Sequence, residues 1–336
     1  MAITMADVAK HAGVSKSTVS QFLNKRYEYM SEETRYKIRD AIKELGYQPN
    51  YVARSLKQKR TSMIGIIVAN IMHRFSTEVC RALEDFFNDY DMNAIICNAD
   101  NDPEKERKYI EMLRAKQVDG LIIFPTGQNI ELYQEMINAT YPVVFMDRKV
   151  KDLIVPTVVV NNKEATKNAV EHLIQNQYTK IAIATEELTI STRHERRQGY
   201  IEALQDHNMP IIEEYMLSTP IQSMAKELKK LFSLEEPPSA LVAANDLVFL
   251  EVLKFAKEND INIGKQLGLI VFDNIPFANL VSPTVTTISQ PAYDMGKKSA
   301  ELLLKLINKE GINSQDTVFS CELYVRESTN GPGDSR

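Results

Sequence analysis

The sequence contains no tryptophan and only three cysteines. Cys80, Cys97 and Cys321 lack paired spacing and lie in apolar segments, which favours buried free thiols over disulfides or a metal site. No apolar run approaches the ~20 residues that a membrane-spanning helix needs. The N-terminus also lacks the basic and long apolar parts of a secretory signal peptide. We therefore expect a cytoplasmic protein without membrane contacts.

The short motifs of common α/β enzymes are also missing. There is no Gly-x-Gly-x-x-Gly motif for dinucleotides, no Walker-type Gly-Lys-Ser/Thr and no Gly-x-Ser-x-Gly nucleophile turn. The five histidines are isolated from one another; His73 and His194 are candidates for ligand contacts at most, and the others are expected at the surface. We expect neither an enzyme nor a bound cofactor or metal ion.

Charge is distributed unevenly along the 336 residues, a length typical of two or three domains. Residues 1–60 carry 12 lysines and arginines against 6 acidic residues, and the remainder carries 28 against 39. A basic segment joined to an acidic remainder indicates that one part of the chain contacts a polyanion. A basic surface that is merely solvated is the alternative.

Three capped helices are predicted before residue 47. Thr4 begins the first helix, and Gly13 ends it and reverses the chain. Ser15 caps a second short helix, and Ser31 caps a third that ends at Gly46. Two short helices joined by a glycine turn are typical of a helix-turn-helix, whose second helix enters the major groove of DNA.

The first 50 residues resemble the DNA-binding headpiece of the lactose/galactose repressor family. The resemblance rests on the blocks TMADVA (4–9), AGVS (12–15), STVS (17–20), LN (23–24) and GYQPN (46–50) at their spacing. It implies that Lys16, Ser17 and Gln21 face base edges of double-stranded operator DNA. The further DNA contacts that it implies are Thr4, Thr18, Ser20, Asn24 and Tyr47, most of them near phosphates.

Gln21 departs from the arginine that is most common at its position in the family. Glutamine pairs well with adenine, whereas arginine pairs well with guanine. We therefore expect the operator to differ from the usual family consensus at the base that Gln21 reads.

Residues 50–57 resemble the family's hinge helix, which folds when two copies of the chain meet in the minor groove. The resemblance implies DNA contacts by Asn50, Ala53 and Leu56. Leu56 would be an apolar wedge in the central base step, a use of leucine that costs a few kcal/mol per unstacked step. An ordinary helix-face contact is the alternative for Leu56. The expected divisions are a headpiece at 1–49, a hinge and linker at 50–62, and an effector-binding and dimerisation domain at 63–336.

From Met63 onward, short apolar runs alternate with amphipathic helical stretches. The predicted strands are 64–69, 94–97, 120–124, 143–146, 181–184, 241–244 and 269–272, and the predicted helices include 78–90, 103–116, 163–175 and 246–258. Strands that are apolar at successive residues are buried on both faces of a parallel sheet. The pattern predicts two Rossmann-like α/β subdomains, one of about 63–160 plus 291–320 and one of about 161–290 plus 321–336.

Polar pairs follow several predicted strands, where ligands of open parallel sheets bind. These pairs are 147–148, 161–162, 245–246 and 273–274; helix capping and turn formation are their alternative roles. Residues 63–336 resemble the same family's effector domain, which is similar to type I periplasmic sugar-binding proteins. The effector contacts that the resemblance implies are Ile71, Phe75, Arg148, Thr192, Arg196, Asn245 and Asp273, with Asn245 and Asp273 as acceptors for hydroxyl groups.

Two departures from the family bear on the effector. Segment 215–221 lacks the expected glycine and aromatic pattern, and Asn161 stands where an aspartate is usual. With Arg148, Arg196 and either Arg74 or Arg193, this predicts a net positive pocket for a carboxylate. The headpiece is also similar to regulators of ketodeoxygluconate use. We therefore hypothesise a sugar-acid effector, with 2-keto-3-deoxygluconate as the candidate.

The function that these features imply is a homodimeric repressor of sugar or sugar-acid catabolism genes, released from a palindromic operator by a small carbohydrate effector. The polar C-terminal segment 327–336 lacks leucine heptads, which favours a dimer over a coiled-coil tetramer. The alternatives are a stand-alone carbohydrate-binding protein and a sugar-processing α/β enzyme.

Overall fold

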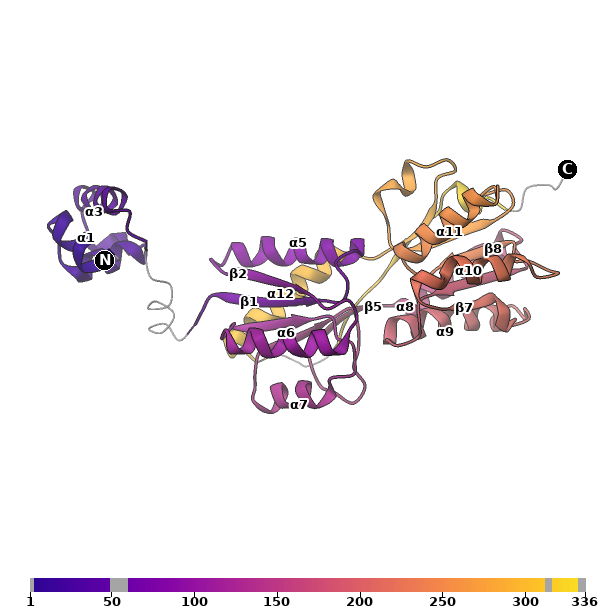
Figure 1. Cartoon of the computed structure of the whole chain (residues 1–336), viewed down its shortest axis with the longest axis horizontal. Coiled ribbons are helices and arrows are strands. Elements are labelled where there is room, and N and C mark those ends of the chain that lie inside the picture. Colours follow the sequence, from indigo (N-terminus) through magenta and orange to yellow (C-terminus); the bar gives the residue numbers. More distant parts are fainter. Residues whose placement is uncertain (1–2, 49–59, 312–315, 332–336) are drawn as a thin grey trace. The chain divides into compact units, whose positions relative to one another are not determined.

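The computed structural model describes residues 3–48, 60–311 and 316–331. The chain divides into an N-terminal unit, Met1–Thr61, and a larger unit, Ser62–Arg336 (Figure 1). The predicted hinge residues Asn50, Ala53 and Leu56 lie outside the described residues, so their roles stay predictions.

Three helices form the headpiece: α1 (Met5–Ala12), α2 (Lys16–Leu23) and α3 (Glu32–Leu45). A short 3₁₀ helix, η1 (Tyr27–Tyr29), lies between α2 and α3 and was not predicted. Val8, Val19 and Ile38, one from each α-helix, are fully buried and pack in one hydrophobic cluster. These residues therefore form a small core that fixes the position of α2.

The predicted helix caps are present in the headpiece. The Thr4 and Asp7 side chains form a reciprocal capping box at α1, and Ser15 and Ser31 accept hydrogen bonds from backbone N–H groups of α2 and α3. Gly13 and Gly46 end α1 and α3 in the left-handed conformation, with φ of 66° and 61°. Other residues adopt this conformation at a cost, which explains glycine at both ends.

The larger unit contains two six-stranded sheets. The first sheet has the order β11-β5-β4-β3-β1-β2 and is parallel throughout. Its strands are β1 (Met63–Val68), β2 (Asn93–Asn98), β3 (Gly120–Ile123), β4 (Val143–Met146), β5 (Thr157–Val160) and β11 (Thr317–Phe319). Helices α5 (Arg74–Asn88) and α12 (Ala292–Ile307) pack on one face, and α6 (Pro103–Ala115) and α7 (Ile130–Asn138) pack on the other. We call this sheet and its helices the N-subdomain.

The second sheet has the order β12-β10-β9-β8-β6-β7, and only the β10 and β12 pair is antiparallel. Its strands are β6 (Ile181–Thr185), β7 (Met216–Ser218), β8 (Ala240–Ala243), β9 (Gly268–Phe272), β10 (Thr286–Ser289) and β12 (Glu322–Tyr324). Helices α8 (Asn162–Gln175) and α9 (Ser191–Asp206) cover one face, and α10 (Ile221–Phe232) and α11 (Asp246–Glu258) cover the other. We call this part the C-subdomain.

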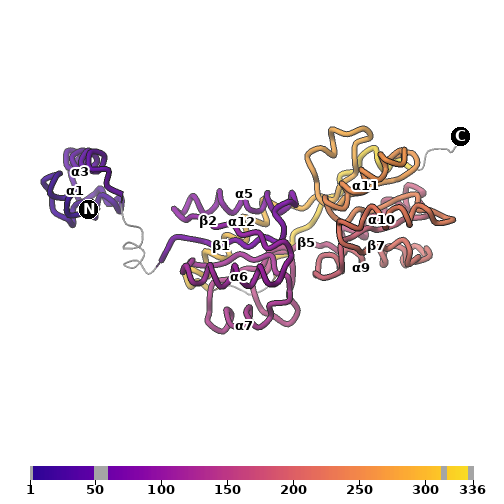
Figure 2. The backbone as a smooth tube through the Cα atoms, viewed as in Figure 1, coloured from indigo at the N-terminus to yellow at the C-terminus, as the bar shows by residue number. Residues whose placement is uncertain are grey.

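The chain passes between the two subdomains three times, after β5, β10 and β11 (Figure 2). Short 3₁₀ helices η2 (Glu213–Tyr215), η3 (Pro276–Asn279) and η4 (Glu327–Thr329) complete the C-subdomain. None of the described helices is long and apolar enough to cross a membrane, and the described residues contain no cluster suited to a metal ion. Cys80 and Cys97 are buried free thiols, whereas Cys321 is only partly buried.

Strand β2 differs from the prediction. The apolar run 94–97 was expected to be buried on both faces, but β2 is the edge strand of its sheet, and Ile96 is 46 % exposed. Four successive apolar residues do not distinguish a central strand from an edge strand, because that position depends on the order of the whole sheet. The helix that follows β1 also begins at Arg74, earlier than the predicted residue 78.

Helices α8 and α9 approach so closely that Gly199 has no room for a side chain. A Cβ atom at Gly199 would lie 2.1 Å from the carbonyl oxygen of Lys163, a backbone atom of α8. Gly199→Ala should therefore lower the free energy of unfolding of the larger unit by about 1–3 kcal/mol, the usual cost of overpacking. Chemical unfolding measures this loss of stability. Gly311→Ala is the control, because a Cβ atom added at Gly311 would have nothing within 4 Å. Equal midpoints for both variants would contradict this packing.

Candidate functional site

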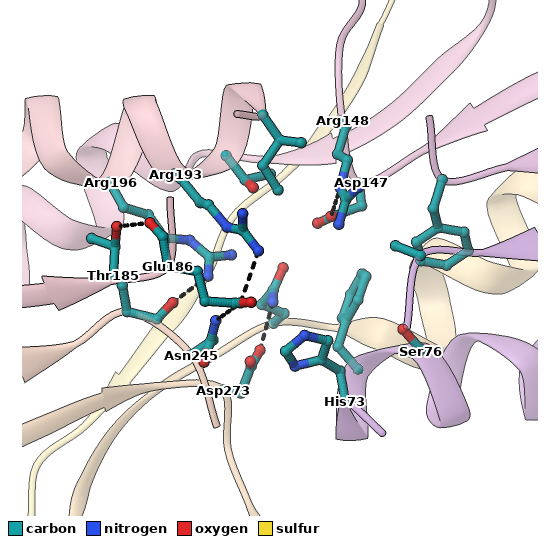
Figure 3. Close-up of a pocket in the computed structure, with 17 residues that line it drawn as sticks. His73, Ser76, Asp147, Arg148, Thr185, Glu186, Arg193, Arg196, Asn245 and Asp273 are labelled. Carbon is teal, nitrogen blue, oxygen red and sulfur yellow. Dashed lines mark hydrogen bonds and ion pairs between the residues drawn. The ribbon is translucent and has the colours of Figure 1, made fainter. Parts of the chain in front are cut away.

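A pocket lies between the N- and C-subdomains, near the carboxyl ends of strands of both sheets (Figure 3). Six of the seven residues that the sequence predicted as effector contacts line it: Phe75, Arg148, Thr192, Arg196, Asn245 and Asp273. Ile71 is not among the lining residues; its side chain packs against the N-subdomain core, and its N–H donates to Asn98 Oδ1 at 3.0 Å. The structure therefore brings together six of these residues, and leaves their binding role a prediction.

Three buried guanidinium groups dominate the wall of the pocket. Arg148 Nε lies 3.2 Å from Asp147 Oδ2, and Arg193 Nη2 lies 2.8 Å from Glu186 Oε2. Arg196 donates to Asn162 Oδ1 at 2.9 Å and to the Ala244 carbonyl at 2.6 Å. Its guanidinium also lies 3.5 Å above the Phe272 ring, a cation–π contact that fixes its plane.

The charges of the pocket are paired more closely than the sequence suggested. Three arginines line it, Arg148, Arg193 and Arg196, together with the carboxylates Asp147, Glu186 and Asp273 and with His73, whose pKa is raised. The net positive pocket therefore stays a prediction. Arg74, a further candidate for positive charge, does not line the pocket and pairs with Glu78 instead. The sequence prediction counted arginines without the carboxylates that face them.

Asn245 forms two side-chain hydrogen bonds within the chain. Its Oδ1, expected to accept from effector hydroxyls, accepts from the Val248 N–H at 2.8 Å and caps α11. Its Nδ2 donates to Glu186 Oε2 at 2.8 Å. Capping is the alternative that the sequence left open for such residues. Glu186 therefore adds acceptor oxygens to this wall, and the role of Asn245 as an acceptor for effector hydroxyls stays a prediction.

Glu186 and Gln290 also line the pocket and were not predicted as effector contacts, although both directly follow strands, as several of the predicted contacts do. Gln290 donates from Nε2 to Asp273 Oδ1 at 2.6 Å, and its own Oε1 is buried without a hydrogen-bond partner among the described residues. An unpaired buried oxygen is costly unless a ligand or water donates to it. Gln290 is thus a further acceptor that a bound molecule can use.

Asp246 connects the two subdomains beside the pocket. Its Oδ1 lies 2.5 Å from His73 Nδ1, and its Oδ2 accepts from the Arg74 N–H at 2.8 Å, at the beginning of α5. Burial opposes protonation of His73, but the hydrogen bond and charge of Asp246 outweigh burial and raise the His73 pKa. The same pairing lowers the Asp246 pKa despite its burial. The Lys149 N–H donates to Ser191 Oγ at 3.0 Å and forms a second link between the subdomains.

The predicted recognition helix presents polar residues on its outer side. Ser17 and Gln21 lie four residues apart, on the side of α2 away from the fully buried Val19. Lys16 and Ser17 are exposed, and Gln21 is partly buried. These are the three residues that were predicted to read base edges.

The other predicted DNA contacts differ in how far they are exposed to solvent. Thr4 and Asn24 are exposed and Thr18 and Ser20 are partly buried, but Tyr47 is only 8 % exposed and belongs to the headpiece core. Packing is therefore an evident role of the Tyr47 ring, and its predicted phosphate contact stays a prediction.

Comparisons with known proteins match both parts of the chain. Residues 4–50 match bacterial regulatory proteins of the lacI family, and residues 61–327 match the periplasmic binding proteins and sugar binding domain of the LacI family. The probable HTH-type transcriptional regulator EndR of Paenibacillus polymyxa is 47 % identical over 92 % of both chains. The HTH-type transcriptional regulator KdgR of Bacillus subtilis is 33 % identical over 97 % of both chains.

Solved structures support the same architecture. The transcription regulator CcpA of Lactococcus lactis is 27 % identical, with a TM-score of 0.73 over 80 % of this chain and 98 % of that one. A Lac repressor bound to ONPG in the repressed state has a TM-score of 0.86 over 98 % of this chain and 100 % of that one, and at 23 % identity it supports the fold alone. With both parts matched and full-length relatives above 30 % identity, this chain belongs to the LacI family of bacterial transcriptional regulators.

Proposed function

We propose that this chain is a homodimeric repressor of sugar-catabolism genes that leaves a palindromic operator when a small carbohydrate binds between its subdomains. The observation that carries the proposal is the combination, in one chain, of a polar outer face on α2 and a polar pocket lined from both subdomains. A DNA-binding regulator shares a compartment with its operator, so the proposal places the protein in the cytoplasm. The predicted hinge, with Leu56 as a minor-groove wedge, is part of this proposal.

The pocket favours a neutral, hydroxyl-rich effector. The sequence pointed to a sugar acid such as 2-keto-3-deoxygluconate on two grounds, an expected net positive pocket and the similarity of the headpiece to regulators of ketodeoxygluconate use. The paired charges of the pocket weaken the first ground. Guanidinium N–H groups donate and carboxylate oxygens accept, so alternating groups of both kinds suit hydroxyls, which do both. A neutral sugar is therefore the effector class that we favour over the sugar acid.

Ligand control of the operator follows from the position of the pocket. Residues from both subdomains line it, and Asp246 links the subdomains at its edge. An effector that binds one arrangement of the subdomains more tightly shifts the chain toward that arrangement, and only to the extent of this difference in affinity. We propose that the favoured arrangement is the one that binds the operator weakly.

Removal of residues 1–60 tests whether the headpiece binds the operator and the larger unit binds the effector. The larger unit keeps its own cores, so we expect effector binding to persist while operator binding is lost completely. Titration calorimetry with sugars and fluorescence anisotropy with operator DNA measure the two activities separately. Operator binding by the shortened chain, or loss of sugar binding from it, would contradict the proposal.

Effector affinity should depend on pH through Asp273. Burial and the charge of Asp246 raise the Asp273 pKa to about 6, although Arg196, Gln290 and His73 favour the ionised form. An effector hydroxyl donates to the ionised carboxylate, so a proton on Asp273 competes with the effector. We expect full affinity well above pH 6 and a loss approaching about tenfold per pH unit below it.

Calorimetry between pH 5 and 8 measures this dependence, and Asp273→Asn is the control because an amide does not titrate. The variant should bind more weakly and with a flatter pH profile. The same slope in both proteins would show that another group causes it.

A further inference from the structure

We infer that Glu186 determines the charge specificity of the pocket and makes it select neutral sugars over their acidic counterparts. This inference rests on the proposed function of the pocket as an effector site. Glu186 follows β6 directly, and its side chain is 15 % exposed, so it is largely withdrawn from bulk solvent. Figure 3 shows its carboxylate between Arg193 and Asn245.

Glu186 occupies the position that an effector carboxylate would otherwise take. Its Oε2 lies 2.8 Å from Arg193 Nη2 and 2.8 Å from Asn245 Nδ2, donors that come from α9 and from the cap of α11. Arg193 is held from a second side by Thr189 Oγ1, 3.2 Å from Nη1. The guanidinium is therefore fixed, and its charge is neutralised from within the chain.

Glu186 offsets the positive charges around Arg193. Burial lowers the Arg193 pKa, and the nearby positive charges of Arg148 and Arg196 act in the same direction, whereas Glu186 opposes them. If Glu186 were neutral, Asp147 and Asp273 would remain as carboxylates beside the three arginines, and the pocket would attract an anionic ligand more strongly. With Glu186 ionised, a ligand carboxylate meets a buried like charge, which is costly in a low dielectric.

The other two arginines do not depend on Glu186. Arg148 has its own carboxylate partner in Asp147, and Arg196 is held by the neutral oxygens of Asn162 and Ala244. The charge of Glu186 can therefore be removed without taking a partner from Arg148 or Arg196. Glutamine at this position keeps an acceptor oxygen for Arg193 and makes the net charge of the pocket more positive by one unit.

Direct binding measurements on the full chain test the inference. The probes are matched pairs that differ in one carboxylate, glucose with glucuronate and galactose with galacturonate, together with 2-keto-3-deoxygluconate. We expect the unaltered chain to bind a neutral member at least about tenfold more tightly than its acid. Glu186→Gln should shift this ratio by at least about tenfold toward the acid. Glu187→Gln makes the same charge change at an adjacent exposed side chain that does not line the pocket, and should leave the ratio unchanged.

The outcomes separate this inference from the proposed function. An unchanged ratio in Glu186→Gln, or tighter binding of any acid than of its neutral partner by the unaltered chain, overturns the role of Glu186 while a sugar effector still stands. If no probe binds any of the three proteins, the carbohydrate effector falls together with the inference. Operator binding by each variant, measured in parallel, confirms that it is folded.

Discussion

Replacement of Arg196 by methionine should remove the response of the repressor to its effector and leave operator binding intact. Arg196 is 7 % exposed, donates to Asn162 and Ala244, and lies over the Phe272 ring. Methionine retains much of the apolar stem and loses every donor. Loss of a buried, hydrogen-bonded charged group from a binding site costs about 2–5 kcal/mol, so effector affinity should fall by about 30-fold to several thousandfold. The variant would remain on the operator at effector concentrations that release the unaltered chain.

Arg197→Met is the matched control for this prediction. Arg197 is the next residue of α9, and its guanidinium pairs with Glu213 rather than lining the pocket. Its loss should leave both effector affinity and release unchanged. Anisotropy of labelled operator DNA during effector titration measures all three proteins, and normal release of Arg196→Met would contradict the placement of the effector.

Replacement of Gln21 by arginine should change which operator the repressor prefers. Gln21 shares with Ser17 the side of α2 away from the headpiece core, so a longer side chain there has room to reach a base edge. Bidentate contacts of glutamine favour adenine and those of arginine favour guanine, by about 1–3 kcal/mol each. Because a dimer presents two copies, the total change in discrimination should be about 2–6 kcal/mol.

Competition between operators that carry adenine or guanine at the position read by residue 21 measures this switch. Gln48→Arg is the control, because it adds the same charge at an exposed headpiece residue outside α2. That variant should bind both operators more tightly without changing the preference between them. An unchanged preference in Gln21→Arg would show that α2 does not read the DNA through this residue.

The headpiece could be predicted closely because its signals are local. Thr4, Ser15 and Ser31 each accept from a backbone N–H three residues further along, and Gly13 and Gly46 adopt the left-handed turn at the residue itself. Interactions of this range can be read from a few neighbouring letters. The 3₁₀ helix η1 has no such side-chain cap, which explains why the sequence did not reveal it.

Helix α9 could not be found from its hydrophobic pattern. Its buried residues include Thr192, Arg193 and Arg196, because this part of the helix faces the pocket instead of an apolar core. A charged buried face does not produce the apolar stripe on which helix prediction depends. The short strands β7, β11 and β12 have three residues each, too few for a reliable alternation.

The position of the candidate pocket could be predicted from the sequence, but the hydrogen-bond and ion-pair partners of its residues could not. Residues that follow parallel strands meet at one edge of a sheet, and the pocket is lined from such edges of both sheets. Arg148, which follows β4 of the first sheet, therefore lies with Asn245 and Asp273, which follow β8 and β9 of the second. The partners of each charge depend on folding between distant segments, as when Glu186 pairs with Asn245, 59 residues away. The sequence therefore indicated charged residues in the pocket but not the pairs that they form.

Selection of DNA from a random pool by the chain of 336 residues, with and without bound sugar, is the most direct test of sugar-controlled operator binding. We expect enrichment of one palindrome with adenine at the position of each half-site that Gln21 reads. We also expect a flexible pyrimidine–purine step at the centre, where Leu56 would enter, and loss of the enrichment when an effector sugar is added. A pool without an enriched palindrome, or one unchanged by every sugar that binds the pocket, would contradict a ligand-controlled repressor.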